Sequence, residues 1–129
     1  MKTTFKITLV MLFLICFSAC DESAVEFGSV IELEEGMTVV MADKSVISLT
    51  EVNDSRCPID ATCVWEGRAE AVIKIESPNV EDEVILNDVE KSDFELSDYR
   101  FEFVELTPFP DVNATSTASK VLKFKISLN

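Results

Sequence analysis

The residues best suited to chemistry lie between Asp54 and Gly67, in the sequence Asp-Ser-Arg-Cys-Pro-Ile-Asp-Ala-Thr-Cys-Val-Trp-Glu-Gly. Cys57 and Cys63 are six positions apart, and two cysteines this close in an oxidising compartment are typical of a disulfide. The chain-entropy estimate for so small a ring is about 2.4 kcal/mol of stabilisation. Zinc ligation by the two thiolates is the alternative, but zinc prefers four ligands. We therefore predict a local disulfide and no metal site.

The chain contains no histidine. This absence excludes Ser-His-Asp and Cys-His catalysis and removes the commonest zinc and copper ligand. Carboxylate, lysine or tyrosine chemistry stays open as a minority alternative. The acids of the segment 88–98 raise the alternative of calcium binding, but their spacing lacks the glycine and terminal glutamate of a calcium loop. We interpret them as a solvated acidic loop, and we predict no catalytic residue and no cofactor; the acids are Asp88, Glu90, Asp93, Glu95 and Asp98.

A further chemical feature is Cys20, which ends an N-terminal export signal. Two early lysines precede an apolar run over residues 7–17, which is shorter than the roughly 17–25 residues that span a membrane. The sequence Phe17-Ser18-Ala19-Cys20 resembles the lipobox of bacterial lipoproteins, with Phe17 where Leu, Ile or Val is usual. An ordinary cleaved signal is the alternative, but it needs a small residue in place of Phe17. The resemblance implies that residues 1–19 are removed and that Cys20 carries a diacylglyceryl thioether and usually an N-acyl chain.

The charge of the chain limits its partners. Removal of residues 1–19 takes away two lysines and no acids, so the net charge changes from −13 to −15. So acidic a surface argues against nucleic acid, and attachment to anionic lipid would depend on the acyl chains. We expect a monomer anchored in the cell envelope, with a possible envelope protein as partner. We favour the outer membrane, at its periplasmic face or the cell surface, over the inner membrane.

The mature chain is long enough for one domain. Residues 20–28 are polar and aperiodic, which predicts a tether before a single β-domain over residues 29–129. Arg68–Glu76 and Val121–Leu128 alternate apolar and polar residues, as half-buried antiparallel strands do. Tyr99–Leu106 alternates too, but its pattern slips by one residue, which indicates a β-bulge.

Shorter strands complete the expected fold. No segment has a convincing helical period, and Asp88–Asp98 and Val112–Ser119 are expected as loops. The pattern predicts an all-β fold, an antiparallel β-sandwich or small barrel of about seven strands with one local disulfide. The shorter predicted strands are Val30–Leu33, Met37–Met41, Ser45–Val52 and Glu83–Leu86, the last at a sheet edge.

The Asp54–Gly67 segment is similar to a pattern in small secreted and lipid-anchored bacterial proteins of unassigned function. That pattern reads acid-Ser-Arg-Cys-Pro, a few residues, Cys, an aliphatic residue, Trp, any residue and Gly. Leu106–Pro110 also resembles the segment that follows the aromatic strand in that group. The resemblance implies a compact β-domain and implies no reaction.

Two interpretations of this segment remain. In the structural one, which we favour, the disulfide pins a crossover between two strands and Trp65 covers the core. Arg56 then pairs with Asp54 or Asp60. In the functional one, the ring presents Pro58–Thr62 as a preorganised binding loop, which loses less entropy on binding.

We therefore predict a non-enzymatic binding or structural module whose ligand the sequence does not name. An inhibitor of a protease or other hydrolase that presents the Cys57–Cys63 loop is the second hypothesis. A metal-binding or enzymatic envelope protein is the third. If the protein binds a partner, the predicted binding loop comprises Arg56, Pro58, Ile59, Asp60 and Trp65.

Overall fold

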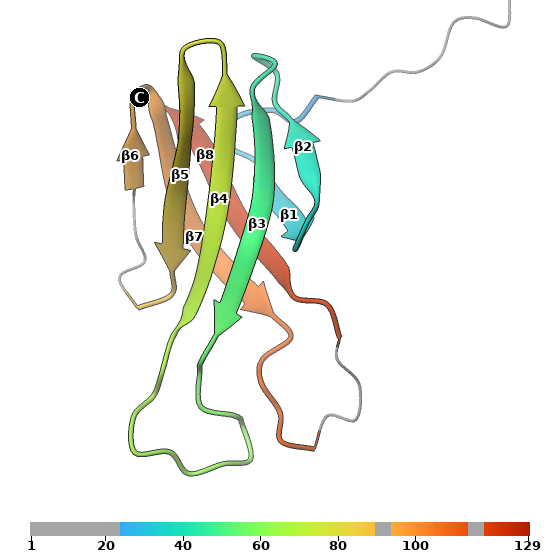
Figure 1. The fold of residues 1–129 in the computed structure, drawn as a ribbon, viewed down its shortest axis with the longest axis vertical. Helices are drawn as coiled ribbons and strands as arrows, with labels where there is room; N and C mark the ends of the chain where they lie inside the picture. Colours follow the sequence, from blue (N-terminus) through green and yellow to red (C-terminus); the bar gives the residue numbers. More distant parts are fainter. Residues whose placement is uncertain (1–23, 90–93, 114–117) are drawn as a thin grey trace, which may run out of the picture.

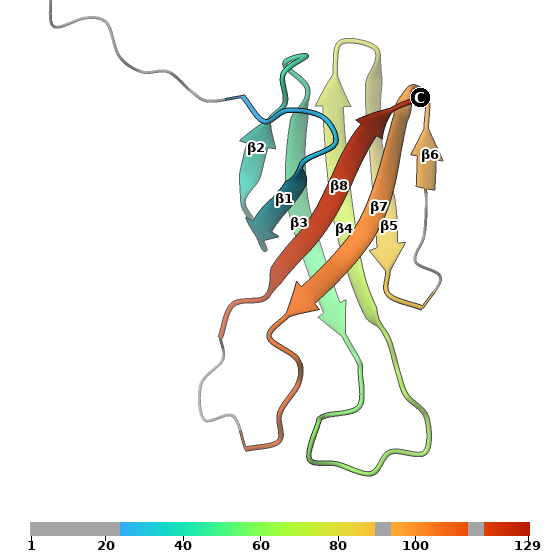
Figure 2. The ribbon, with the colours of Figure 1, turned by 180° about the vertical axis from the view of Figure 1, so that it is seen from behind.

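The computed structural model describes residues 24–89, 94–113 and 118–129. Two four-stranded sheets pack face to face in it (Figures 1 and 2). The strands are β1 (Val30–Glu34), β2 (Thr38–Val40), β3 (Val46–Asp54), β4 (Ala69–Ser77), β5 (Val80–Asn87), β6 (Phe94–Leu96), β7 (Tyr99–Thr107) and β8 (Val121–Leu128).

The strand order is β1-β8-β7-β6 in one sheet and β2-β3-β4-β5 in the other, and each pair of neighbours is antiparallel. The expected all-β fold is confirmed, as a sandwich with one local disulfide rather than a small barrel. The described ranges contain eight strands, one more than the predicted number. They contain no helix long and apolar enough to cross a membrane.

The core lies between the two sheets, where alternate residues of each strand point inward. In β4 the buried side chains include Ile73 and Ile75, and in β7 and β8 they include Phe101 and Phe124. Each such side chain contributes about 1.5–3 kcal/mol by leaving water, and the aromatic rings fill the space between the layers. The alternation that predicted these strands is therefore the alternation that builds the core.

The pairing of the described strands shifts register at two β-bulges. The predicted bulge in β7 is confirmed, since the pairing with β8 shifts between Phe103 and Glu105 and so returns Leu106 to the core. A second bulge, between Leu49 and Glu51 of β3, has no counterpart in the predictions.

Two predicted boundaries need correction. The edge strand expected at Glu83–Leu86 is β5, which is longer because its first residues pair with the end of β4. The segment Asp88–Asp98, expected as a loop, contains β6, because Phe94–Leu96 pairs with the start of β7.

The chain joins the sandwich earlier than predicted. Val25 forms a bridge with Met41, and the Gly28 amide donates to the Ile126 carbonyl oxygen at 2.7 Å. Val25 and Phe27 also pack against the core. Residues 25–28, assigned to the tether from their sequence, are thus part of the folded domain.

The two ends of the sandwich differ in their connections. The short turns at 42–44 and 78–79 lie at one end, together with the C-terminus and the first described residues (Figure 1). We call this the turn end. The long connections 55–68 and 108–120 extend from the opposite end, which we call the loop end (Figures 1 and 2).

Candidate functional site

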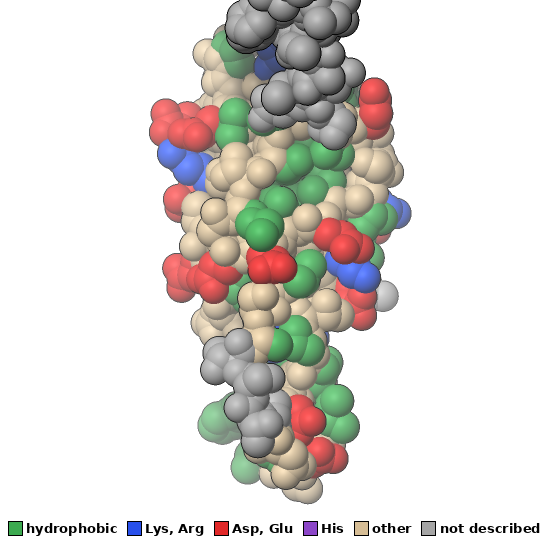
Figure 3. All heavy atoms as spheres, turned by 90° about the vertical axis from the view of Figure 1, so that its right-hand side faces the viewer, with side chains coloured by type: hydrophobic (Ala, Val, Ile, Leu, Met, Phe, Trp, Pro, Cys, Tyr) green, Lys and Arg blue, Asp and Glu red, His purple; other side chains and the backbone are tan. Residues whose placement is uncertain are grey.

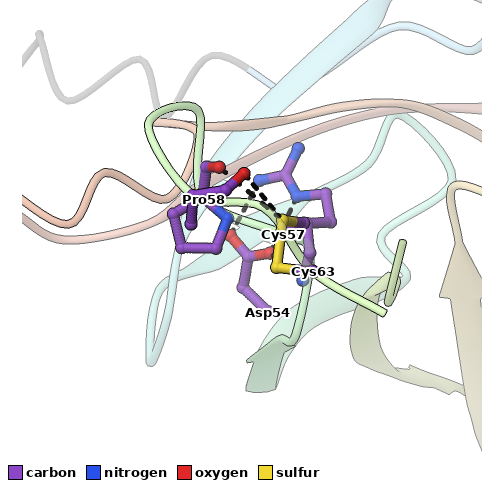
Figure 4. Close-up of a disulfide and its surroundings, with 6 residues drawn as sticks. Asp54, Cys57, Pro58 and Cys63 are labelled. Atoms are coloured by element: carbon purple, nitrogen blue, oxygen red, sulfur yellow. Dashed lines mark hydrogen bonds and ion pairs between the residues drawn. A yellow bond between two sulfur atoms is a disulfide. The ribbon is translucent and has the colours of Figure 1, made fainter. Parts of the chain in front are cut away.

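The connection 55–68 continues the β3–β4 hairpin beyond the sheet. The Ser55 amide donates to the Arg68 carbonyl oxygen at 2.9 Å, and the Cys57 amide donates to the Glu66 carbonyl oxygen at 2.8 Å. The Cys57–Cys63 disulfide then closes a ring beyond these bonds, which confirms the predicted pairing (Figure 4). The connection is therefore a stiff extension of the sandwich rather than a slack loop.

Gly67 allows the two arms of this extension to approach. Its φ is +68°, a left-handed conformation that L side chains rarely adopt. A Cβ at this position would also overlap the carbonyl oxygen of Ser55. Only glycine fits here, because both the backbone conformation and the close contact exclude a side chain.

A nearly buried carboxylate anchors the base of the extension. The Asp54 side chain is 6% exposed, and it accepts hydrogen bonds at 2.7 Å from both Nε and Nη2 of Arg56. Such two-point pairing is strong because the planar guanidinium matches the carboxylate. Of the two predicted partners of Arg56, Asp54 is the one that the structure shows.

Lys120 joins the second long connection to the same carboxylate. Its Nζ donates to Asp54 at 2.7 Å and to the Pro108 carbonyl oxygen at 2.6 Å, while Arg56 Nη2 donates to the Leu106 carbonyl oxygen at 3.0 Å. Asp54 belongs to one sheet, and Leu106 belongs to the other. The ion cluster therefore connects both sheets and both connections at the loop end.

The surroundings of Asp54 lower its pKa. Burial alone would raise the pKa of this carboxyl group, but the hydrogen bonds and charges of Arg56 and Lys120 outweigh burial and bring the pKa below its ordinary value of 3.8. Asp54 is consequently ionised throughout the neutral range, and the cluster persists there.

The two long connections also touch farther from the sheets. The Ile59 amide donates to the Pro110 carbonyl oxygen at 3.1 Å, and Asn113 Nδ2 donates to Asp60 Oδ2 at 3.1 Å. The Arg56 guanidinium lies 4.2 Å from the centre of the Phe109 ring, a cation–π contact. Together the two connections form one platform.

Apolar side chains project from this platform into solvent. Trp65 is 78% exposed, Val64 is 96% exposed and Ile59 is 69% exposed. The expectation that Trp65 covers the core is wrong. The paired arms carry residues 64 and 65 beyond the last layer of core side chains. Hydrophobic side chains are visible at this end of the molecule in Figure 3, beside acidic ones.

The remaining residues of the predicted binding loop form a tight turn. The Ala61 amide donates to the Pro58 carbonyl oxygen at 3.1 Å, which places Ile59 and Asp60 at the two central positions of a β-turn. Four of the five predicted loop residues thus lie together on the platform, and Arg56 lies beneath them with its side chain 10% exposed.

A hollow of about 510 Å³ opens beside the platform. Asp88 at its margin is fixed by the hydrogen bond that its Oδ1 accepts from the Ala69 amide at 2.9 Å. Nothing in the sequence indicates that Asp88 and Phe109 line the same hollow, because they follow different strands. The hollow is lined by Arg56, Cys57, Glu66, Gly67, Asp88, Val89 and Phe109.

The other predicted sites lie wholly or partly outside the described residues. Cys20 lies outside the described residues, as do Glu90 and Asp93 of the acidic segment. Across the ranges 24–89, 94–113 and 118–129, no three potential side-chain ligands gather in a way that could hold a metal ion. Comparison of the chain with protein-family models, curated proteins and solved structures finds no match.

Proposed function

We propose that the protein is a lipid-anchored, non-enzymatic binding module of the cell envelope that contacts a partner protein with its loop end. The observation that carries this proposal is the exposure of Ile59, Val64 and Trp65 on a platform held by a disulfide and a nearly buried ion cluster. Exposed aromatic and aliphatic side chains gathered at one place mark interaction surfaces, and tryptophan is enriched among the residues that dominate binding energy.

The rigidity of the platform supports a binding role. A mobile loop loses conformational entropy when it binds, about 0.5–1.5 kcal/mol for each side chain that becomes fixed. Here the backbone around the apolar side chains is already fixed by Gly67, the ring and the contacts to Pro110. The backbone part of the ordering cost is therefore met when the protein folds, and only the exposed side chains have still to be ordered on binding.

The position of the expected anchor fits the same function. The first described residues lie at the turn end, opposite the platform, where Val25 pairs with Met41 beside the 42–44 turn (Figures 1 and 2). The chain between Cys20 and Ala24 spans at most about 14 Å when extended. A domain attached through Cys20 would sit close to the bilayer with its turn end, and it would direct the platform away from the membrane.

The composition supports a role without catalysis. The chain has no histidine, so the commonest general base is absent. Asp43 and Asp54 are each fixed by several hydrogen bonds that connect parts of the fold.

The inhibitor hypothesis receives less support from the geometry. A substrate-like inhibitor offers an extended segment that pairs with the enzyme as an added strand. Residues 58–61 instead form a closed turn, and the Ile59 amide is already bonded to Pro110. Partner binding through the apolar surface needs no such extended segment.

Cross-linking in the native cells tests the binding role. The full-length protein and its Trp65→Ser variant are cross-linked and purified, and Met37→Ser serves as a control because Met37 is half exposed outside the loop end. We expect a partner protein with the native chain and with Met37→Ser, and its loss with Trp65→Ser. Equal recovery with all three chains would contradict the proposal.

Mass spectrometry of the mature N-terminus tests the anchor, since an unmodified Cys20 would refute it.

A further inference from the structure

Two carboxylates line the hollow beside the platform. Glu66 and Asp88 both line it, and neither forms an ion pair with any residue in the described ranges. Asp88 uses Oδ1 to accept the Ala69 amide, which holds the carboxylate in place and leaves Oδ2 available. Within the part of the chain that the structure describes, two negative charges without an ion-pair partner thus face the same space.

The one cationic side chain that lines the hollow is already ion-paired. The Arg56 guanidinium is paired with Asp54 at two points, covered on one face by Phe109 and only 10% exposed. Asp54 is shared with Lys120, so these three groups together keep one net positive charge. Glu66 and Asp88 bring two negative charges, so the charge around the hollow is negative on balance.

Other residues that line the hollow are apolar. Val89 is 67% exposed and Phe109 is 44% exposed, and both line the hollow. Trp65 precedes Glu66 in the chain and extends the apolar surface beyond the rim. Lysine and arginine side chains suit such a place, because their aliphatic stems pack on apolar groups while their charged ends stay with carboxylates.

We infer that this hollow receives a lysine or arginine side chain of the partner protein, flanked by apolar residues that contact Trp65 and Val89. The inference rests on the proposed function and specifies the chemistry of the partner. A volume of about 510 Å³ accommodates one such side chain with a neighbour, since specific ligand pockets typically measure about 300–1,000 Å³.

The overall charge favours the same partner. A chain with a net charge of −13 attracts basic proteins over long range and repels a second copy of itself. It also repels anionic lipid, so an acidic membrane surface is a poor occupant of the platform. Among proteins, a basic segment with apolar neighbours therefore complements both the hollow and the molecule as a whole.

Capped tripeptides provide defined probes. The isotope-labelled full-length chain in non-ionic detergent micelles is titrated with acetyl-Leu-Lys-Leu-amide, acetyl-Leu-Gln-Leu-amide and acetyl-Leu-Glu-Leu-amide. Amide signals of Gly67 and the indole signal of Trp65, the only tryptophan, report occupation of the hollow by NMR. We expect saturable shifts with the lysine peptide that weaken as salt is raised, and none with the glutamate peptide.

Variants separate the two carboxylates from general charge effects. Glu66→Gln with Asp88→Asn keeps the side-chain shapes and the Asp88 Oδ1 acceptor, and it should weaken the lysine peptide about tenfold or more. Glu35→Gln with Glu51→Gln removes the same charge from exposed acids that do not line the hollow, and it should change the affinity less than twofold.

The outcomes distinguish this inference from the proposed function. Three results would overturn the inference that the hollow receives a cationic side chain. They are equal binding of the lysine and glutamine peptides, no saturable shift, and an unchanged affinity in the Glu66→Gln, Asp88→Asn variant. Recovery of a partner in cells that depends on Trp65 would still support the proposed function. If phosphatidylcholine vesicles instead shift the Trp65 signal, and the Lys peptide does not, the occupant is a lipid surface and both proposals fail.

Discussion

The two ends of the sandwich are closed by the same device and differ in what surrounds it. At the turn end, Asp43 accepts hydrogen bonds at 2.6 Å from the hydroxyl groups of Ser45 and Tyr99, and so joins the β2–β3 turn to the other sheet. At the loop end, Asp54 joins the sheets through Arg56 and Lys120. At each end, one well-bonded aspartate thus joins the two sheets.

The loop end contains much more than this closure requires. Its hairpin extension adds a disulfide, a glycine in the left-handed conformation and three strongly exposed apolar side chains. Exposed Trp65 and Val64 contribute nothing to the core, and a disulfide in the extension cannot hold the sheets together. The difference between the ends indicates that the extension serves to expose a binding surface, whereas the turn end only completes the fold.

The largest expected effect on stability is that of Gly67→Ala. The new Cβ would overlap the Ser55 carbonyl oxygen and would also hold a non-glycine residue at φ +68°, so we expect a loss of about 2–4 kcal/mol. Gly36→Ala is the matched control, because Gly36 has φ +83° but nothing near its Cβ position. It should cost only about 1–2 kcal/mol in denaturant unfolding. Equal losses would show that the arms of the extension are not closely packed.

Neutralising the two aspartates compares the ends directly. Asp54→Asn leaves Arg56 and Lys120 without their shared negative charge, and it should lower the free energy of unfolding by about 2–3 kcal/mol. Asp43→Asn affects only neutral donors, namely two hydroxyl groups and the Ser45 amide, and should cost about 1 kcal/mol. Denaturant unfolding of both variants measures the difference, and a larger loss at Asp43 would reverse our ranking of the two clusters.

Removing the disulfide should destabilise the protein without unfolding it. The Cys57→Ser, Cys63→Ser variant loses about 2 kcal/mol by the chain-entropy estimate for a small ring. The sandwich should persist, because the core lies between the sheets and away from the ring. Circular dichroism should therefore show an unchanged strand signal with a lower melting temperature. Loss of the strand signal at room temperature would show that the ring is needed for folding itself.

Lowering the pH should weaken the stabilising contacts at both ends of the sandwich, and it should weaken those at the loop end more than those at the turn end. Burial raises the pKa of Asp43, but hydrogen bonds from Ser45 and Tyr99 outweigh it, so the pKa of Asp43, like that of Asp54, lies below 3.8. Groups with lowered pKa values stabilise the fold fully above their unfolded values, and this contribution disappears as the pH falls through the folded values. Unfolding measured between neutral pH and about pH 2 should show this loss. Asp54→Asn should flatten the curve more than Asp43→Asn does, and the opposite order would contradict our comparison.

The smallest stability effect is expected for Trp65→Ser. A side chain that is 78% exposed buries little surface, so the free energy of unfolding should change by less than about 0.5 kcal/mol. The same substitution should abolish the recovery of a cross-linked partner protein from the native cells. Thermal unfolding provides the measurement, and a loss near that of a core aromatic residue would restore the interpretation of Trp65 as a structural residue.

The sequence predicts the strands better than it predicts the site. Alternating segments such as Val121–Leu128 were found to the residue, because period two reflects burial on one face. The disulfide followed from short spacing, and spacing limited the partner of Arg56 to Asp54 or Asp60, of which the structure shows Asp54. Trp65 was misplaced because large aromatic residues are usually buried, and no local pattern records that the extension projects beyond the core.

Long-range contacts explain most of the remaining failures. Lys120 reaches Asp54 across 66 positions, and Tyr99 reaches Asp43 across 56. Such pairs depend on how the sheets stack, which hydropathy patterns do not specify. The same holds for Asp88, which joins the hollow only because β5 ends beside the start of β4.

A site-specific photo-cross-linker at each end tests the central claim most directly. The photoreactive residue replaces Val64, which is 96% exposed on the platform, or Asn79 in the turn between β4 and β5, in the full-length protein in its native cells. We predict a cross-linked partner protein from position 64 and none from position 79. A partner captured from position 79 alone, or equally from both positions, would contradict the assignment of the loop end as the binding surface.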